Sequence, residues 1–162
     1  MKNTIKLYWI SIWLSVAILP AFAQNNLPPC QGIDVSTWNN CFGEESITMG
    51  SRTDKYVGSW KNGKYHGSGT FIIGIGEKYT GEFQNGLYHG QGTFFYKNGN
   101  KYIGEYKNDK KNGRGTFTYS NGSNYIGEWK DGLRAGFGTL YSTNGTLVNK
   151  GVWVNDKFIG AE

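Results

Sequence analysis

The chain has 162 residues, a formal net charge of +5 at pH 7 and 25 glycines, and aromatic residues make up 16% of it. Its lysines and arginines alternate with acids instead of forming a basic stripe, which excludes a dedicated nucleic-acid binder. So much glycine beside so many aromatic residues is also unlike a disordered tail and predicts β structure with many tight turns.

The first 23 residues have the pattern of a secretory signal peptide. Two lysines precede an apolar run over 7–19, and "AFA" at 21–23 has the small-x-small form of a cleavage site. The alternative is a membrane anchor, but the run is shorter than the roughly 20 residues that a spanning helix needs. We therefore expect cleavage before Gln24, export to the periplasm or the medium, and no transmembrane segment in the product.

The two cysteines, Cys30 and Cys41, both lie after the expected cleavage site. An even number of cysteines in an oxidising compartment indicates one disulfide. Two cysteines alone cannot complete a zinc site, and their spacing is not that of a redox C-x-x-C pair. We interpret them as a structural disulfide, with a stabilisation of roughly 3 kcal/mol in the chain-entropy model.

A repeat of 23 residues follows and fills most of the remaining chain. The copies span 56–78, 79–101, 102–124 and 125–148, and a partial copy, "GVWVNDKF", lies in the stretch that ends at 162. Residues 24–55 precede them as an N-terminal cap with a truncated repeat. Such a period is the mark of a repeat architecture in which each unit contacts its neighbours.

Each copy contains two runs of period two, as in Tyr79-x-Gly81-x-Phe83 and then Gly90-x-Gly92-x-Phe94. Asn-Gly or Asp-Gly pairs separate the runs, which is the strongest short-range signal for a β-hairpin. The predicted fold is all-β: one elongated, twisted, single-layer antiparallel sheet of consecutive hairpins, preceded only by a cleaved signal helix. In such a sheet the large rings must lie over neighbouring strands, which requires glycine at the positions that they cover.

The repeats resemble MORN repeats, the membrane occupation and recognition nexus motif, with the pattern Y-x-G-x-W-x-x-G-x-x-H-G-x-G. "YVGSWKNGKYHGSGTF" and its three successors carry the resemblance, which runs from Tyr56 to about Phe158. The third copy departs from the pattern at Asp109 and Asn112, and the fourth at Ala135. The resemblance implies the same elongated sheet and implies no enzyme.

The lead-in "LPPCQGIDVSTWNNCFG" resembles the start of small exported bacterial proteins with these repeats. That resemblance implies that Trp38 to Gly43 mimic a truncated repeat. It further implies that Cys30 and Cys41 fasten this segment as the N-terminal cap.

The candidate catalytic residues have simpler explanations. His66 and His89 share a column two strands apart, so about 10 Å should separate them, too far for one zinc ion. The glutamates of another column, Glu82, Glu105 and Glu128, lie at a similar spacing, just outside the range for a glycosidase pair. We interpret them as solvated positions paired with neighbouring Thr, Gln, Lys or Arg side chains. No catalytic, cofactor or metal site is predicted.

Two sets of residues are candidates for binding. The densest basic cluster consists of Lys107, Lys110, Lys111 and Arg114. The aromatic row consists of Tyr56, Trp60, Tyr79, Phe83, Tyr102, Tyr106, Tyr125, Trp129 and Trp153. These rings either pack within the sheet or, where exposed, contact a peptide, a glycan or a lipid surface.

Three functions compete. The first is a non-catalytic exported scaffold that binds a protein partner or the envelope surface. The second is a binder of anionic phospholipid or cell-envelope glycan, in which the basic cluster makes the contacts. The third, a small hydrolase, has the least support, because a single-layer sheet offers no enclosed pocket.

Overall fold

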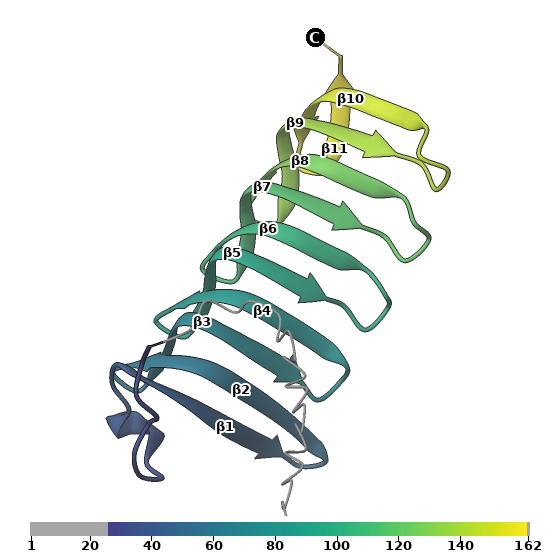
Figure 1. Cartoon of the computed structure of the whole chain (residues 1–162). Coiled ribbons are helices and arrows are strands. Elements are labelled where there is room, and N and C mark those ends of the chain that lie inside the picture. The colour runs from purple at the N-terminus through teal and green to yellow at the C-terminus, as the bar shows by residue number, and fades with distance from the viewer. Residues whose placement is uncertain (1–25, 162) are drawn as a thin grey trace, which may run out of the picture.

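The computed structural model describes residues 26–161 as one sheet (Figure 1). A short 3₁₀ turn, η1 (Val35–Thr37), precedes the strands. The strands are β1 (Cys41–Met49), β2 (Arg52–Lys61), β3 (Lys64–Ile73), β4 (Glu77–Gln84), β5 (Leu87–Phe95), β6 (Lys101–Lys107), β7 (Lys110–Thr118), β8 (Asn124–Lys130), β9 (Leu133–Tyr141), β10 (Leu147–Val154) and β11 (Lys157–Gly160). The predicted signal peptide lies outside the described residues.

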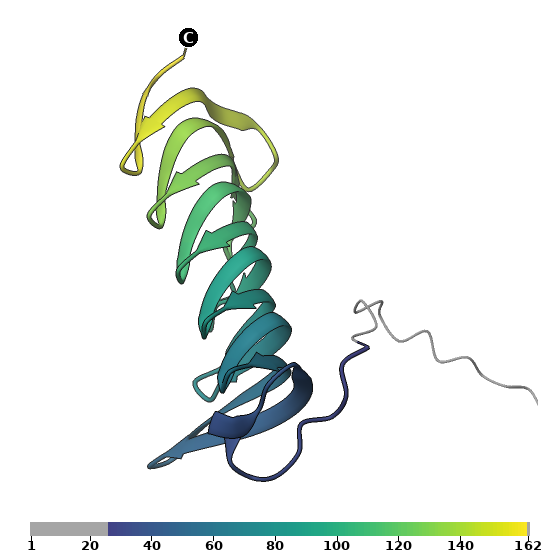
Figure 2. The ribbon, with the colours of Figure 1, turned by 90° about the vertical axis from the view of Figure 1, so that its left-hand side faces the viewer.

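All eleven strands follow one another in chain order, and each described pair is antiparallel. The predicted all-β meander is therefore confirmed. Figure 1 shows the hairpins stacked along one long axis, and Figure 2 shows each strand curling as it crosses that axis. No second layer covers either face within 26–161.

The hairpin turns inside the repeats explain why these strands form where they do. In the first repeat Asn62 and Gly63 both have positive φ, at 51° and 68°. This is the backbone that a two-residue turn needs to match the twist of its strands, and Asn and Gly adopt it most readily. Asp109 occupies the glycine position of the third repeat with φ of 65°, and its carboxylate accepts the Tyr88 N–H at 2.7 Å. That hydrogen bond offsets the strain of the departure from the repeat pattern.

A row of glycines crosses the sheet from strand to strand. The strand register pairs Gly58 with Gly69, and the row as a whole comprises Gly43, Gly58, Gly69, Gly81, Gly92, Gly104, Gly115, Gly127, Gly138 and Gly151. The tyrosine ring of each repeat lies over this row: a Cβ built on Gly69 would be 2.6 Å from Tyr56 Cε2. The predicted seating of rings over bare backbone is therefore confirmed.

The rings form one continuous core on one face of the sheet, which we call the Tyr face. Tyr79 lies edge-on to Phe83 of its own strand at 5.1 Å and to Tyr106 of the next repeat at 5.2 Å, and the other repeats use the same arrangement. Edge-to-face pairs at such distances add about 1 kcal/mol each beyond area burial. Each hairpin therefore completes the core of its neighbour.

The segment before β1 closes the N-terminal end. Cys30 and Cys41 form a disulfide, as predicted, and the Cys30 N–H donates to Phe42 O at 2.9 Å. The Trp38 ring meets Trp60 edge-on at 4.9 Å, and Trp38 O accepts the Gly63 N–H at 2.8 Å. Because part of the β1 edge is thus covered, the first repeat has a partner for its rings on the N-terminal side.

Candidate functional site

The predicted aromatic row is buried. None of its rings is more than 5% exposed, and the four repeat tyrosines are fully covered. Their hydroxyls are also used inside the sheet, since Tyr56 Oη donates to Ser59 O at 2.9 Å and Tyr79 Oη to Glu82 O at 2.9 Å. These rings pack the sheet and present no surface to a ligand.

A second column on the Tyr face, missed by the sequence analysis, covers those tyrosines. It consists of Tyr65, Tyr88, Lys111 and Arg134, which we call the covering column. Tyr65 stacks on Tyr56 with centroids 3.8 Å apart, and Tyr88 stacks on Tyr79 at 3.9 Å. The signal was positional: each member stands two residues after the second turn residue, although the residue types differ.

The predicted basic cluster is divided between environments. Lys111 Nζ lies on the Tyr face, 4.0 Å from the ring centroid of Trp129, and burial lowers the pKa of this amine to about 8. Lys110 Nζ lies 3.8 Å from Asp131, and Lys107 is exposed on the opposite strand of the same hairpin. Arg114 stands opposite Glu128 in the register. The structure does not gather these four cations into one site.

Lys107 and Lys110 line a shallow hollow of about 690 Å³ at this hairpin. Glu128 and Asp131 also line it, so its charges are mixed. An anionic lipid or glycan would meet acids as well as bases there. This hollow gives the basic cluster little selectivity for anions.

The glutamate column has a structural role. Glu82 Oε1 accepts the Gln91 N–H at 3.0 Å, and Glu105 Oε1 accepts the Arg114 N–H at 2.8 Å. Both bonds lie beside shifts in the strand register, where a residue has no ladder partner. These carboxylates thus satisfy backbone donors of the adjoining strand, whereas the sequence analysis expected side-chain partners for them.

The two histidines belong to no cluster of possible metal ligands in the described part of the chain. Both are half-buried, and the Nδ1 atoms of His66 and His89 have no hydrogen-bond partner. Across residues 26–161 no three His, Cys, Asp or Glu side chains are grouped so as to hold a metal ion.

The opposite face, which we call the Thr face, carries the exposed apolar residues. A row of threonines follows the strands there, and Thr70 Oγ1 lies 3.2 Å from Thr80 Oγ1. In the third and fourth repeats, Ile103, Ile126 and Phe137 line an open hollow of about 500 Å³ and are each 42–48% exposed. We call this the apolar hollow. It was not predicted, although Ile103 and Ile126 occupy the same column of the repeat.

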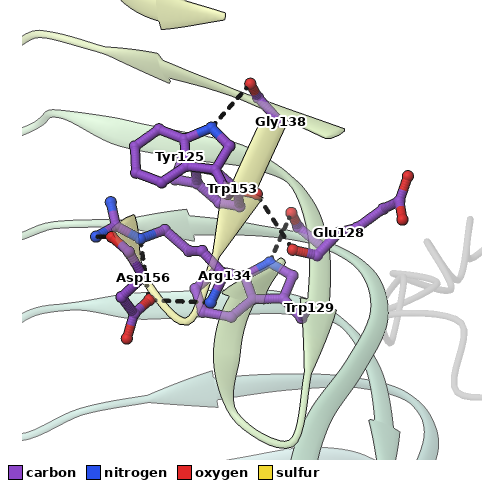
Figure 3. A network of polar contacts seen from close by, with 8 residues as sticks. Tyr125, Glu128, Trp129, Arg134, Gly138, Trp153 and Asp156 are labelled. Atoms are coloured by element: carbon purple, nitrogen blue, oxygen red, sulfur yellow. Dashed lines mark hydrogen bonds and ion pairs between the residues drawn. The ribbon is translucent and has the colours of Figure 1, made fainter. Parts of the chain in front are cut away.

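A smaller hollow lies on the Tyr face, where the first two repeats meet the hairpin turn of the third. It has a volume of about 250 Å³ and is lined by Tyr65, Phe71, Phe83, Gly86, Tyr88 and Asp109. We call it the tyrosine hollow. At the C-terminal end, the place of Tyr88 and Asp109 is taken by Arg134 and Asp156, whose Nε and Oδ1 lie 3.0 Å apart (Figure 3).

Comparison with known proteins assigns the repeats. The family model described as "MORN repeat" matches residues 56–77, 79–101, 102–124 and 125–147, together more than half of the chain. The comparison with curated proteins found no match. Within the part that the structure describes, no helix has the length and apolarity to cross a membrane. The four matches, the glycine row and the seated tyrosines lead to one conclusion: the chain belongs to the MORN-repeat family.

Proposed function

We propose that the chain is an exported, non-catalytic binding module that uses the Thr face to contact a protein partner. The observation that carries this proposal is the apolar hollow. Three large apolar side chains stand exposed together on a sheet whose other face is filled by packed rings. Exposed apolar groups rimmed by polar ones are typical of protein–protein contact sites.

The rim of the hollow supports a protein partner over an anionic membrane. Gln91, Glu105, Arg114 and Glu128 surround the apolar residues, so both signs of charge and an amide are available for hydrogen bonds. Such a mixed polar rim around an apolar centre is usual for protein interfaces. An anionic lipid surface would instead favour a run of bases.

The roles of the acids support a non-catalytic function. Glu82 and Glu105 accept backbone N–H donors and hold the strand irregularities beside them. A carboxylate oxygen that accepts a backbone N–H of the neighbouring strand has a structural task in the sheet. The hollows are also open, whereas a reaction that must exclude water needs an enclosed site.

The disulfide supports export. Bonds such as Cys30–Cys41 form and persist in oxidising compartments, and the expected signal peptide would deliver the chain there. The periplasm and the medium both satisfy this condition.

The test is binding of purified 24–162 protein to envelope and secreted fractions, followed by titration with each partner isolated. Ile126→Glu and Phe137→Glu place a charge in the apolar hollow and should weaken binding by at least about tenfold. Ile72→Glu is the matched control, because Ile72 is 42% exposed on a strand outside the hollow. Unchanged binding by both hollow variants would overturn the proposal.

Vesicles that contain anionic phospholipid provide the second arm of this experiment. The proposal predicts little sedimentation with them. Strong sedimentation that is lost in a Lys107→Ala, Lys110→Ala, Arg114→Ala variant would favour the lipid-binding alternative instead.

A further inference from the structure

We propose that the tyrosine hollow binds an organic cation, an alkylammonium or guanidinium group supplied from outside the chain. This site lies on the Tyr face and is formed by the first two repeats together with Asp109 from the turn of the third. It is therefore separate from the apolar hollow and independent of the function proposed for the Thr face.

An equivalent set of residues occupies the same place two repeats further along the sheet. The residues that line the tyrosine hollow have equivalents in the C-terminal repeats: Tyr65 corresponds to Lys111, Phe71 to Phe117, Phe83 to Trp129, Gly86 to Gly132, Tyr88 to Arg134, and Asp109 to Asp156. The rings, the turn glycine and the carboxylate are kept. Two tyrosines of the covering column are replaced by two cations.

The cations of the C-terminal copy lie against its rings. Lys111 Nζ is 4.0 Å from the centroid of Trp129 and 4.7 Å from that of Phe117. An ammonium over ring faces at these distances is attracted by their negative potential. The chain thus shows that this arrangement of rings accepts a positive charge.

The carboxylate of the C-terminal copy binds a guanidinium. Asp156 Oδ1 accepts both the backbone N–H of Arg134 at 2.9 Å and its Nε at 3.0 Å, and the guanidinium covers the ring of Trp153 at 4.4 Å (Figure 3). In the tyrosine hollow Asp109 Oδ1 accepts the backbone N–H of Tyr88 at 2.7 Å in the same way. Among residues 26–161, however, no Lys or Arg forms a salt bridge with Asp109.

The surroundings of the tyrosine hollow are acidic. Glu45 Oε2 accepts the hydroxyl of Tyr65 at 2.8 Å. Burial is the main cause that raises the pKa of the Tyr88 phenol, and the carboxylates of Asp109, Glu77 and Asp54 raise it further. No Lys or Arg is among the described residues that line the hollow, and Lys64 lines the adjoining hollow together with Glu45. Asp54 is paired with Arg52, so the carboxylate that the hollow itself offers is that of Asp109. Ring faces beside a carboxylate are the chemistry that recognises quaternary ammonium and guanidinium groups.

The size of the hollow limits the ligand. About 250 Å³ is less than the roughly 300–1,000 Å³ of sites for drug-sized molecules. It suits a single headgroup or the end of one side chain. Trimethylammonium and methylguanidinium groups fit within this volume.

The experiment is a titration of the disulfide-bonded 24–162 protein with choline, followed by the NMR signals of Tyr65 and Tyr88. The neutral isostere 3,3-dimethylbutan-1-ol is the control for shape without charge. We expect saturable shifts at both rings with choline and binding at least about fivefold weaker with the alcohol. Equal binding of choline and the alcohol would show that the tyrosine hollow recognises shape and not charge, which would overturn the proposal. The absence of a saturable shift with either choline or methylguanidinium would also overturn it.

Methylguanidinium provides a second titration, and tighter binding of either cation identifies the preferred headgroup.

Tyr88→Arg recreates the Arg134–Asp156 pair with Asp109 and should weaken cation binding by about tenfold or more, because the chain then fills its own site. Asp109→Asn should weaken binding by about fivefold. Asp131→Asn is the matched control, since Asp131 is an exposed turn carboxylate outside the hollow. Unchanged affinity in both Tyr88→Arg and Asp109→Asn would contradict the proposal.

Discussion

The first two repeats and the last two cover equivalent buried tyrosines with different types of side chain. Tyr65 and Tyr88 stack flat on the ring beneath them, whereas Lys111 and Arg134 extend a cation over it. The rings below, the glycine row and the turns are common to both halves. The comparison shows that the sheet needs the covered tyrosine and the bare glycine, while the cover itself is free to vary and to acquire other uses.

The largest expected effect tests the part that the halves share. A Cβ on Gly81 would lie 2.6 Å from Tyr79 Oη, and one on Gly104 would lie 2.7 Å from Tyr102 Oη, each beside the backbone of the next strand. Gly81→Ala and Gly104→Ala should each lower the free energy of unfolding by about 3 kcal/mol, because backbone cannot move aside cheaply. Chemical denaturation measures both. Gln84→Ala and Lys107→Ala, exposed on the same strands, are the controls and should stay within about 0.5 kcal/mol.

The next largest effect is a difference in stability between variants of the two turn aspartates, Asp156 and Asp109. Asp156→Ala removes a backbone cap and the partner of a half-buried guanidinium, and should cost about 2 kcal/mol. Asp109→Ala removes only the cap on Tyr88 and should cost about 1 kcal/mol. Thermal unfolding of the two variants gives the difference. Equal losses would mean that the guanidinium adds nothing to the C-terminal half.

A substitution in the covering column makes the third repeat resemble the second. Lys111→Tyr replaces a half-buried amine by a ring that can stack on Tyr102, as Tyr88 stacks on Tyr79. We expect a gain of about 1 kcal/mol in the free energy of unfolding at pH 7. The reciprocal variant, Tyr88→Lys, should lose stability. A loss in both would show that the cover is specific to its repeat.

The pH dependence of stability should also differ between the halves. Burial lowers the pKa of Lys111 to about 8, against about 10.5 for an unfolded lysine. Between these values the unfolded chain binds one more proton than the folded chain, so the free energy of unfolding rises with pH. The contribution of Lys111 to that free energy is complete above pH 10.5 and is lost as the pH falls through 8. Wild type should therefore gain stability from pH 8 toward 10 relative to Lys111→Tyr, and parallel curves would contradict this assignment.

Tyrosines limit that gain at the alkaline end. Burial raises the pKa of Tyr125 to about 12, above the value near 10 in the unfolded chain. The contribution of Tyr125 to the free energy of unfolding is complete below pH 10 and is lost as the pH rises through 12. The comparison of Lys111 variants is therefore confined to pH 8–10.

The smallest effect concerns one ring in the buried row. Tyr106 Oη is buried without a hydrogen-bond partner, whereas Tyr102 Oη donates to Glu105 O at 3.1 Å. Tyr106→Phe should leave stability within about 0.5 kcal/mol of wild type or raise it, and Tyr102→Phe should cost about 1 kcal/mol. Denaturation curves of the pair are the measurement. A clear loss in Tyr106→Phe would mean that its hydroxyl has a partner in solution.

The fold was predictable because every repeat contains the same local sequence signals. The period of two, the Asn-Gly turns and the placement of Gly81 beneath a tyrosine are each visible within one copy. The cap was predictable only in outline. That Trp38 O accepts the Gly63 N–H depends on a register that no single repeat contains.

The sites were harder to predict, because they depend on which face each side chain takes. Lys110 and Lys111 are neighbours in sequence, yet one pairs with an exposed acid and the other lies among rings. Glu105 looked solvated until the strand irregularity beside it supplied a backbone N–H. Each hollow contains a pair from one repeat column, Tyr65 with Tyr88 and Ile103 with Ile126, but its lining as a whole comes from several different columns.

The most direct test of the central claim is amide hydrogen exchange of the wild-type 24–162 protein. If the seated tyrosines and the glycine row hold both halves alike, the amides of Gly81 and Gly104 should exchange only through global unfolding, with the same free energy. A clearly lower free energy of exchange in either half would contradict the claim. It would show that the variable cover, and not the shared row of rings over glycine, decides which repeats are stable.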